Sequence, residues 1–362
     1  MNGSGTTTLE AYLRHRRGIG CDIDPLAVRI ARVKATPLQI DAPRLTGTFV
    51  KSARRWLKDD AAIDKALDER FDAKTRAFID YWFFAETRRE LIALLLAMED
   101  YTQGSAVREL LEVVFSGIIV TKSGGVSRAR DLAHSRPHLD PAKTPLHAID
   151  AFEHRLARFA PVISALPDHL PRAGIIQSSA RKLALRDGSV DLIVTSPPYA
   201  NAIDYMRANK FSLAWLGTSV SDLGRLRSRY IGSECTGDTA MEPLPGLTED
   251  VLGRLQALDR RKEAVLRKYY LEMRDAIREM YRVLCPGRYA VIVAGTSTMR
   301  GLDVKTPYCL ADIAQHYPGF GLEGILQRSL DRDRRMMPFS KGRTQIERRM
   351  GTEEVIVLRK PE

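Results

Sequence analysis

A serine, two prolines and a tyrosine follow one another at Ser196–Tyr199, directly after the apolar run Val190–Thr195. Two adjacent prolines can continue neither a helix nor a central strand, so the chain must turn there. The Ser196 hydroxyl and the Pro197 carbonyl could accept hydrogen bonds from an amino group whose lone pair is delocalised into a ring, and Tyr199 could stack on that ring. The pattern therefore indicates chemistry on the exocyclic amino group of a nucleic-acid base. A proline-rich surface turn is the structural alternative.

A second set of residues, near the N-terminus, has the spacing of a nucleotide site. Gly3 and Gly5 precede a helical apolar pattern and would let a ligand approach the backbone closely. The helix behind them offers free N–H groups. The run Gly18–Asp22 predicts a strand that ends on an acid, and Asp22 at that place could accept both hydroxyls of a ribose. A helix-capping turn and an unrelated surface acid would explain the same residues.

Strands and helices alternate around these residues, which predicts an α/β fold with a mainly parallel sheet. We expect strands at 18–22, 174–177, 190–195 and 289–294, and a helix over 25–34 with Asp24 as its N-cap. Ligands bind at the carboxyl ends of the strands in such sheets. The residues expected at those ends are Asp22, Ser179, Ser196–Tyr199 and Gly295.

The middle of the chain has a different pattern, and residues 38–172 are expected to form a mainly helical insertion. Apolar residues recur there at helical spacing over 49–57, 78–98, 107–120 and 148–166.

The last third returns to mixed elements. Residues 218–249 are expected to be irregular. A long helix, broken once, is expected over 251–284 and should end at Cys285-Pro286-Gly287. Residues 322–330 and 354–358 predict two strands around a basic loop.

The proline-containing segment also carries a family resemblance. Asp191–Tyr199 resembles motif IV of the amino-group DNA methyltransferases, in the serine form common among cytosine-N4 enzymes; adenine-N6 enzymes more often have Asp or Asn first. Asn2–Thr7 is similar to the family's cofactor loop, and Gly20–Pro25 to its acidic ribose-binding strand end. The run Leu284–Ala294 matches the family's pattern too.

The resemblance implies a class I methyltransferase-like (Rossmann-like) fold. Its catalytic domain would comprise residues 1–37 and 173–362, with 38–172 as the helical insertion and 218–262 as a candidate target-recognition segment. It implies S-adenosylmethionine as the methyl donor and direct transfer to a base amino group of DNA, cytosine N4 more often than adenine N6. The implied catalytic residues are Ser196, Pro197, Pro198 and Tyr199, and the implied cofactor-binding residues are Asn2, Gly3, Ser4, Gly5, Thr6, Asp22, Ser179 and Thr195.

Two departures from the family's pattern matter. In the family a central strand precedes the cofactor loop, whereas this sequence starts at Met1, inside the loop. We therefore expect an upstream-encoded segment or a partner chain to complete the sheet, or else the chain is a non-catalytic nucleic-acid-binding remnant. Ser178 and Ser179 stand where the family often has an acid near the cofactor's adenine, and Ser179 could replace it as a weaker acceptor.

The charge of the chain favours a polyanionic partner. Lys and Arg number 56 and Asp and Glu 45, which gives a formal net charge of +11. A solvated charged surface is nevertheless the simpler interpretation of any single arginine. An RNA substrate stays open, because amino-methylating RNA enzymes of the same fold have a similar motif. The residues that could contact a nucleic-acid backbone are Arg225, Arg227 and Arg229, and, nearer the C-terminus, Arg334, Arg335, Lys341 and Arg343.

Other chemistries fit the sequence less well. The four cysteines form no CxxC pair, which argues against a zinc module and a disulfide framework. Cys285 follows a long helix rather than the motif strand, so it is expected to be a buried structural residue and not a carbon-5 nucleophile. The seven histidines lack metal spacing, so no metal is expected. Without a signal core or a membrane-length apolar run, a cytoplasmic protein with no membrane partner is expected.

Overall fold

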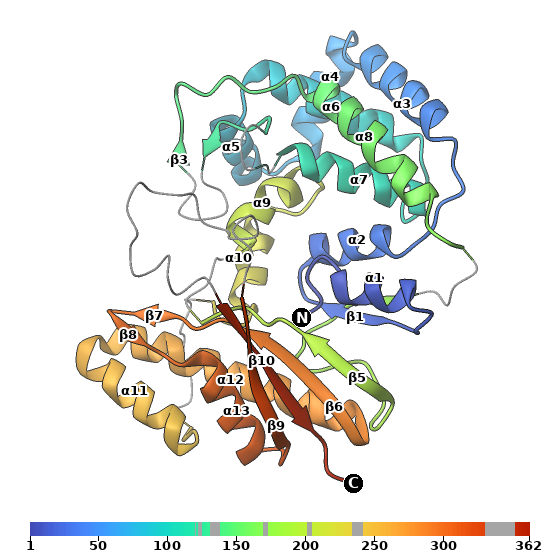
Figure 1. The fold of residues 1–362 in the computed structure, drawn as a ribbon. Helices are drawn as coiled ribbons and strands as arrows, with labels where there is room; N and C mark the ends of the chain where they lie inside the picture. The colour runs from blue at the N-terminus through green and yellow to red at the C-terminus, as the bar shows by residue number, and fades with distance from the viewer. Residues whose placement is uncertain are drawn as a thin grey trace.

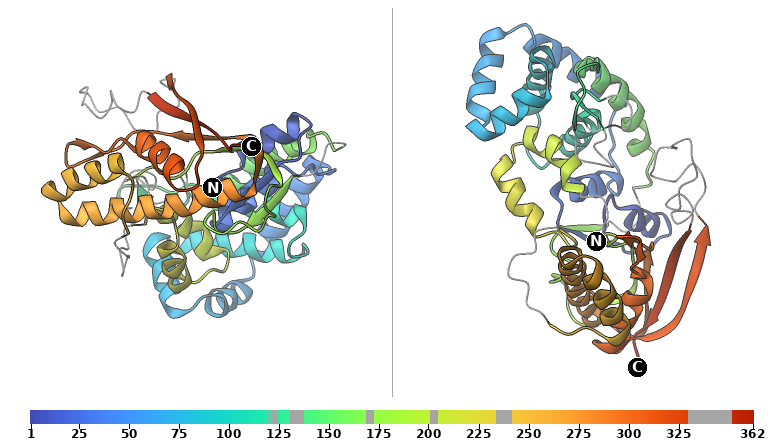
Figure 2. Two further views of the ribbon diagram at one scale, coloured as in Figure 1. Left: turned by 90° about the horizontal axis from the view of Figure 1, so that it is seen from below. Right: turned by 90° about the vertical axis from the view of Figure 1, so that its left-hand side faces the viewer.

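The computed structural model describes residues 1–119, 121, 125–130, 138–168, 173–200, 205–233, 242–329 and 352–362. The chain forms a mainly helical part and an α/β part, which lie above and below one another in Figure 1. The right-hand view of Figure 2 shows the same two parts, with the N-terminus near the boundary between them. The predicted α/β class is confirmed.

The N-terminal segment folds as the sequence predicts. Helix α1 (Thr6–Leu13) leads to strand β1 (Ile19–Asp22) and then to helix α2 (Pro25–Lys34). Asp24 caps α2, since its Oδ1 accepts hydrogen bonds from the backbone N–H groups of Leu26 (2.8 Å) and Ala27 (3.2 Å). Strand β1 pairs in parallel with β4 (Gly174–Gln177), which places Asp22 opposite Gln177.

A four-stranded sheet forms the frame of the α/β part. Its strand order is β5-β6-β10-β9, and the strands are β5 (Val190–Thr195), β6 (Leu284–Ala294), β9 (Gly321–Ser329) and β10 (Thr352–Arg359). Strand β5 runs parallel to β6, whereas β10 runs antiparallel to both of its neighbours. The parallel pairs β1–β4 and β5–β6 are the ones that end at the predicted site, and the predicted C-terminal pair of strands is β9 and β10.

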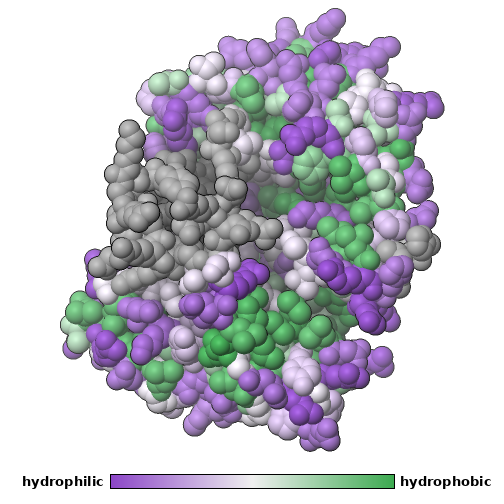
Figure 3. All heavy atoms as spheres, viewed as in Figure 1, coloured by the Kyte–Doolittle hydropathy of each residue, from purple (hydrophilic) through white to green (hydrophobic). Residues whose placement is uncertain are grey.

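Two helices cover one face of this sheet. Helices α12 (Arg260–Val283) and α13 (Thr306–His316) pack on alternate residues of β6 and β10, among them Ala290, Ile292 and Ile356, in one buried core. The residues between those point to the other face. There Leu192, Val194, Tyr289 and Leu326 are exposed, and Figure 3 shows hydrophobic residues gathered over these strands.

The helical part has a core of its own. It contains α3 (Ala42–Trp56), α4 (Asp60–Arg70), α5 (Ala73–Trp82), α6 (Ala85–Glu99), α7 (Ala106–Ile119) and α8 (Ala148–Ser164), with a short pairing of β2 (Ala129–Arg130) and β3 (His138–Leu139). Helix α9 (Tyr205–Trp215), which follows the motif in the chain, packs into the same core through Phe211 and Trp215. Segments from both before and after Ser196–Tyr199 in the sequence therefore contribute to the core of the helical part.

Three local expectations can be compared with the structure, and one of them was wrong. Residues 218–249 contain helix α10 (Val220–Ser228), which Ser219 caps through the Asp222 N–H, as well as the start of α11 (Gly246–Leu258). The long helix ends at Val283, directly before Cys285-Pro286-Gly287, as expected, and β6 begins at Leu284, ahead of the expected strand over 289–294. The expected break in the long helix is confirmed and falls at Asp259, which caps α12 through the Lys262 N–H. A small pair, β7 (Thr298–Met299) and β8 (Leu302–Asp303), follows β6.

Within the described helices, none is both long and apolar enough to span a lipid bilayer.

Candidate functional site

The N-terminal residues lie between the ends of β1 and β5, as Figure 1 shows. The Met1 amino group donates a 2.7 Å hydrogen bond to the Cys21 carbonyl, and the Asn2 N–H bonds to the same carbonyl at 3.0 Å. On the other side, Thr195 Oγ1 donates to the Met1 carbonyl at 2.9 Å. The glycine-containing loop and the proline-containing loop, which the sequence separates by almost 200 positions, are thus joined through one residue.

Asp22 organises the glycine-containing loop. Its Oδ2 accepts a 2.8 Å hydrogen bond from the Gly3 N–H, and its Oδ1 accepts one of 3.0 Å from the Asp24 N–H. Each carboxylate oxygen has a further lone pair, so the same side chain can still accept hydroxyl groups of a ligand. Gly3 has φ +52°, and a Cβ added to it would meet nothing within 4 Å. The backbone here faces open space, which suits close approach of a ligand.

Gly5 has a different role from the one that its spacing suggested. A Cβ on Gly5 would lie 2.6 Å from the Cβ of Ala31 in α2, and its φ is +80°. The glycine therefore lets α1 pack closely against α2. The exposed Ser4 and Thr6 flank it, and Ser4 Oγ accepts a 3.2 Å hydrogen bond from Lys34 Nζ.

Two buried polar atoms beside Asp22 have no hydrogen-bond partner among the described residues. They are Asn2 Nδ2 and Ser178 Oγ. A buried polar group without a partner is costly, so such atoms indicate where a ligand or water binds. Ser179, in contrast, already accepts a 3.3 Å hydrogen bond from the Arg181 N–H. Asn2, Asp22 and Ser178 together fit a ligand that carries several hydroxyl and amino groups.

The proline-containing loop is held from behind. Pro197 is buried and Ser196 is exposed. Tyr269 of α12 donates a 2.9 Å hydrogen bond from its hydroxyl to the Pro198 carbonyl. Tyr199 packs against Gly295, where an added Cβ would lie 3.1 Å from its ring, and its hydroxyl donates to Glu353 of β10. Ser196 thus faces solvent while the residues after it are fixed.

The chain just after α10 also contacts helix α12, close to the proline-containing loop. Glu272, one turn after Tyr269 in α12, is buried and accepts a 2.9 Å hydrogen bond from the Gly232 N–H. It also pairs with Lys268 at 3.0 Å and with Arg181 at 3.4 Å. Helix α12 therefore holds both the motif loop and the chain just after α10.

The predicted nucleic-acid contacts are only partly within the described residues. Arg225 pairs with Asp222 and remains 80% exposed. Arg227 takes part in an interaction of its own, and the Arg229 carbonyl accepts a 3.4 Å hydrogen bond from Arg181, so this basic segment lies beside the candidate site. The remaining predicted contacts, Arg334, Arg335, Lys341 and Arg343, lie outside the described residues.

Three side chains that hold the site were missed from the sequence. They are Tyr269, Glu353 and Asn209. Asn209 Nδ2 donates a 2.6 Å hydrogen bond to Asp24 Oδ2 and so ties α2 to α9. Burial raises the pKa of the Asp24 carboxyl. A tyrosine or asparagine inside an amphipathic helix gives no signal of such contacts, because their partners are distant in the chain.

Cys285 differs from its sequence expectation in burial. It was expected to be buried but is half-buried at the start of β6, and its Sγ donates to the Gly188 carbonyl at 3.1 Å. Cys285 lies at the start of β6, far from Ser196, because Leu284 pairs with Val190 whereas Ile292 pairs with Thr195.

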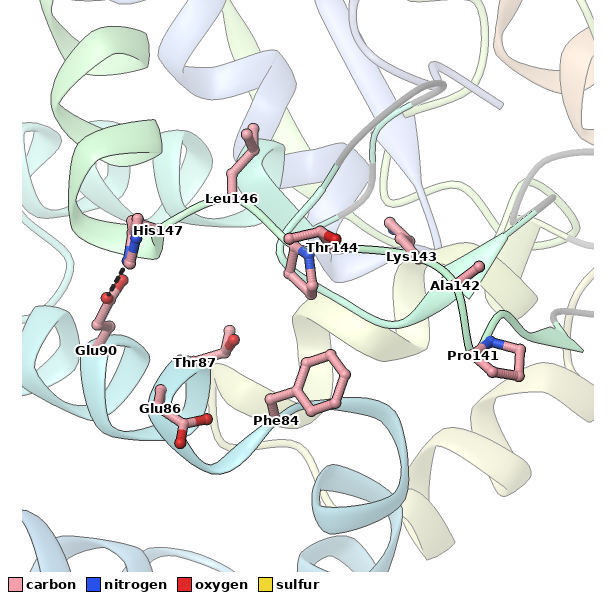
Figure 4. Close-up of a pocket in the computed structure, with 11 residues that line it drawn as sticks. Phe84, Glu86, Thr87, Glu90, Pro141, Ala142, Lys143, Thr144, Leu146 and His147 are labelled. Atoms are coloured by element: carbon pink, nitrogen blue, oxygen red, sulfur yellow. Dashed lines mark hydrogen bonds and ion pairs between the residues drawn. The ribbon is translucent and has the colours of Figure 1, made fainter.

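A pocket of about 360 Å³ lies in the helical part, between α6 and residues 141–147. Figure 4 shows the pair His147–Glu90 at one end of it, Pro141 at the other and Phe84 between them. It contains none of the predicted site residues. No cluster of three or more metal-ligand side chains occurs in the described parts of the chain.

The chain is similar in sequence to type II methyltransferases, although no family model matches it. It is 21% identical over 343 residues to the type II methyltransferase M.MvaI of Kocuria varians, across 87% of this chain and 73% of the relative. It is 30% identical over 190 residues to the type II methyltransferase M.AvaI of a Nostoc species, across 47% of this chain. The match spans 36% of that second relative.

Solved structures resemble the chain only weakly. A protein of Thermus thermophilus, provisionally named a DNA modification methylase, superposes with a TM-score of 0.25 at 17% identity over 51% of each chain. Its complex with S-adenosyl-L-methionine gives a TM-score of 0.26 at 18% identity, over 51% of this chain and 54% of that one. Similarity at this level carries no argument about function, so the sequence relatives and the site itself are what bear on it.

Proposed function

We propose that this chain is an S-adenosylmethionine-dependent DNA methyltransferase that methylates the exocyclic amino group of a base, cytosine N4 in particular. One observation carries the proposal. The 2.9 Å hydrogen bond from Thr195 Oγ1 to the Met1 carbonyl joins a nucleotide-type loop to the strand that ends in Ser196–Tyr199. Two half-sites with complementary chemistry thus meet. The similarity to type II methyltransferases supports the same reaction.

The N-terminal half would hold the methyl donor. Asp22 would accept the ribose hydroxyls, and the open backbone at Gly3 would let the ligand lie against the loop. Asn2 and Ser178 would bind polar groups of the ligand with the atoms that have no partner among the described residues. When bound, S-adenosylmethionine supplies a methyl group on a positively charged sulfur. Thr195 would support the loop rather than touch the ligand, because its hydroxyl is bonded to Met1.

The Ser196–Tyr199 half would hold the base. Ser196 Oγ and the Pro197 carbonyl would accept the two hydrogens of the amino group, which favours a tetrahedral nitrogen with an available lone pair. Tyr199 would stack on the flipped base. The nitrogen gains the methyl group and releases one proton to solvent, and no covalent bond to the protein forms. Positioning supplies most of the rate enhancement.

The DNA would lie along the side of the site that carries the basic segment after α10. Arg225, Arg227 and Arg229 would contact phosphates, while the helical residues 38–172 and the segment 218–262 are candidates for reading the target sequence. Residues 1–37 and 173–362 would form the catalytic domain. The proposed enzyme would act in the cytoplasm.

A further strand would complete the sheet between β1 and β5. Each of the two has only one neighbour among the described strands. An unpaired strand edge is a template for pairing with another strand. The strand could come from a segment joined to Met1 or from a partner chain. Hydrogen exchange at 19–22 and 190–195 tests this: an apolar strand fused ahead of Met1 should slow exchange at both edges, and a proline-containing fusion should not.

Transfer of a labelled methyl group tests the reaction itself. The purified chain is incubated with labelled S-adenosylmethionine and, side by side, with DNA of mixed sequence, tRNA and rRNA. We expect label in DNA only, as N4-methylcytosine after digestion, and none with Ser196→Ala. Label in RNA alone, or in no substrate despite cofactor binding by calorimetry, would overturn the DNA assignment. N6-methyladenine in the digest would correct the base.

A further inference from the structure

Tyr269 contacts the motif loop from the buried side. It lies in the middle of α12, its ring is buried, and its hydroxyl donates a 2.9 Å hydrogen bond to the Pro198 carbonyl. Burial raises the pKa of the Tyr269 phenol, so the hydroxyl keeps the proton that it donates. The phenol therefore stays protonated in the neutral range, and its hydrogen bond goes to the backbone of the loop rather than to a side chain.

This bond determines how the neighbouring carbonyl is directed. Successive carbonyls of an extended segment point in different directions, and proline rings restrict the rotation between them. With the Pro198 carbonyl bonded to α12, the Pro197 carbonyl is directed elsewhere. Among the described residues, neither that carbonyl nor the Ser196 hydroxyl has a hydrogen-bond partner. Both acceptors are available together.

We propose that Tyr269 is a positioning residue, which fixes the direction of the Pro197 carbonyl toward the substrate amino group by holding the Pro198 carbonyl. The inference rests on the proposed function of the Ser196–Tyr199 loop, and it adds a residue that no motif contains. Tyr269 touches neither substrate nor cofactor. Its effect is on the rate of the step that needs both acceptors.

Helix α12 also contacts the chain just after Arg225, Arg227 and Arg229, and so holds that segment close to the Ser196–Tyr199 loop. A Cβ on Gly232 would lie 3.4 Å from the Tyr269 ring, and the Gly232 N–H is bonded to Glu272 one turn further along α12. Lys268 Nζ donates to Ser233 Oγ at 3.0 Å. Loss of the Tyr269 hydroxyl alone leaves this packing in place, because the ring remains.

Tyr270 provides a matched control. It follows Tyr269 directly, is also buried, and donates its hydroxyl to a backbone carbonyl, that of Val304, at the same 2.9 Å distance. Val304 precedes α13 and is not part of the motif loop. Phenylalanine at either position removes one hydrogen bond from a tyrosine hydroxyl to a backbone carbonyl. The two variants therefore separate a general loss of stability from a loss of positioning.

Steady-state kinetics of Tyr269→Phe and Tyr270→Phe test the proposal. We expect kcat to fall about 10- to 100-fold in Tyr269→Phe, with KM for DNA and Kd for S-adenosylmethionine changed less than about threefold. Tyr270→Phe should keep kcat within about twofold of the wild type. An unchanged kcat in Tyr269→Phe, or an equal loss in Tyr270→Phe, would overturn the positioning role.

Hydrogen exchange gives a readout that does not need activity. Pro197 and Pro198 have no N–H, so the relevant amides are those of Tyr199 and Ala200. Tyr269→Phe should speed exchange there and not near Val304, and Tyr270→Phe should do the reverse. If the wild type transfers no methyl group, the proposed function fails. If Tyr199 and Ala200 exchange equally fast in Tyr269→Phe and wild type, the contact itself has no positioning effect.

Discussion

The two halves of the candidate site are supported in different ways. The Ser196–Tyr199 half stands on a four-stranded sheet and a 24-residue helix, and side chains from distant elements, Tyr269 and Glu353, hold it. The Asp22 half stands on a two-stranded parallel sheet, and nearby backbone N–H groups hold it. Two paired strands are marginally stable alone. The Ser196–Tyr199 half is therefore held by more of the fold than the Asp22 half.

This difference predicts which quantity each substitution changes. Changes in the Asp22 half should act mainly on cofactor affinity and on stability. Changes around Ser196–Tyr199 should act mainly on turnover, because the acceptors there must be held in one direction.

Asp22→Ala should have the largest effect. It removes the carboxylate that we propose accepts the ribose hydroxyls, together with the two hydrogen bonds from the Gly3 and Asp24 N–H groups. We expect the Kd for S-adenosylmethionine to rise by about 100-fold or more, as expected when hydrogen bonds to a charged group are lost. Calorimetry measures it. Asp191→Ala is the control, since that exposed acid lies at the other end of β5. Equal affinities in Asp22→Ala and the control would remove Asp22 from the cofactor site.

The two loop glycines should respond differently to alanine. In Gly5→Ala the new Cβ would lie 2.6 Å from Ala31 at φ +80°, so we expect a loss of about 2–3 kcal/mol in the free energy of unfolding. Gly3→Ala meets nothing within 4 Å, so its backbone strain at φ +52° should cost about 1 kcal/mol. Denaturant unfolding measures both, and a Gly3 variant that is the less stable of the two would contradict this assignment of roles.

The sequence predicted the parts of the site that depend on local pattern. Strands β4 and β5 and helix α2 have the predicted bounds, because apolar runs, Pro25 and the Asp24 cap are local signals. The contact between the two loops could only be inferred from the rule that ligands bind at strand ends. The Met1–Thr195 bond gives that inference a geometry.

The parts that were missed depend on tertiary contacts. Helix α10 was missed because its apolar positions, such as Leu223, are few and its cap, Ser219, is a common loop residue. Tyr269 and Glu353 look like an ordinary core aromatic and an ordinary strand acid. Only the fold shows that both bond to the motif loop, from residues 71 and 154 positions away.

Glu353→Gln should have a smaller effect than Asp22→Ala, and on a different quantity. Glu353 accepts the Tyr199 hydroxyl and pairs with Arg328 at 2.6 Å. Gln keeps an acceptor but loses the charge, so we expect kcat to fall about 5- to 10-fold, with cofactor Kd unchanged. Glu323→Gln, at an exposed position of β9, is the control. A change in cofactor Kd without a change in kcat would mean that Glu353 acts in the Asp22 half and not in the Ser196–Tyr199 half.

The smallest effects are expected at two helix caps, Asp24 and Asp72. Their contributions to stability should change with pH in opposite directions. Burial raises the pKa of Asp24 above its ordinary value of 3.8, so its contribution to stability is present below that pH and is lost as pH rises through the raised pKa. Hydrogen bonds from Thr75 lower the pKa of Asp72, the cap of α5, so its contribution is present above pH 3.8 and is lost as pH falls through the lowered pKa.

Asparagine at either position removes the titration and keeps the cap. Between pH 4 and 7, the Tm of Asp24→Asn should therefore rise relative to wild type with increasing pH, by on the order of 1–3 °C. The Tm difference of Asp72→Asn should stay constant over that range and shrink only in more acidic solution. If the Tm differences of the two variants change with pH in the same way, the pKa of Asp24 is not raised by burial. A rise for Asp24→Asn with a constant difference for Asp72→Asn would mean that the Asp22 half contains a buried carboxylate that costs stability at neutral pH.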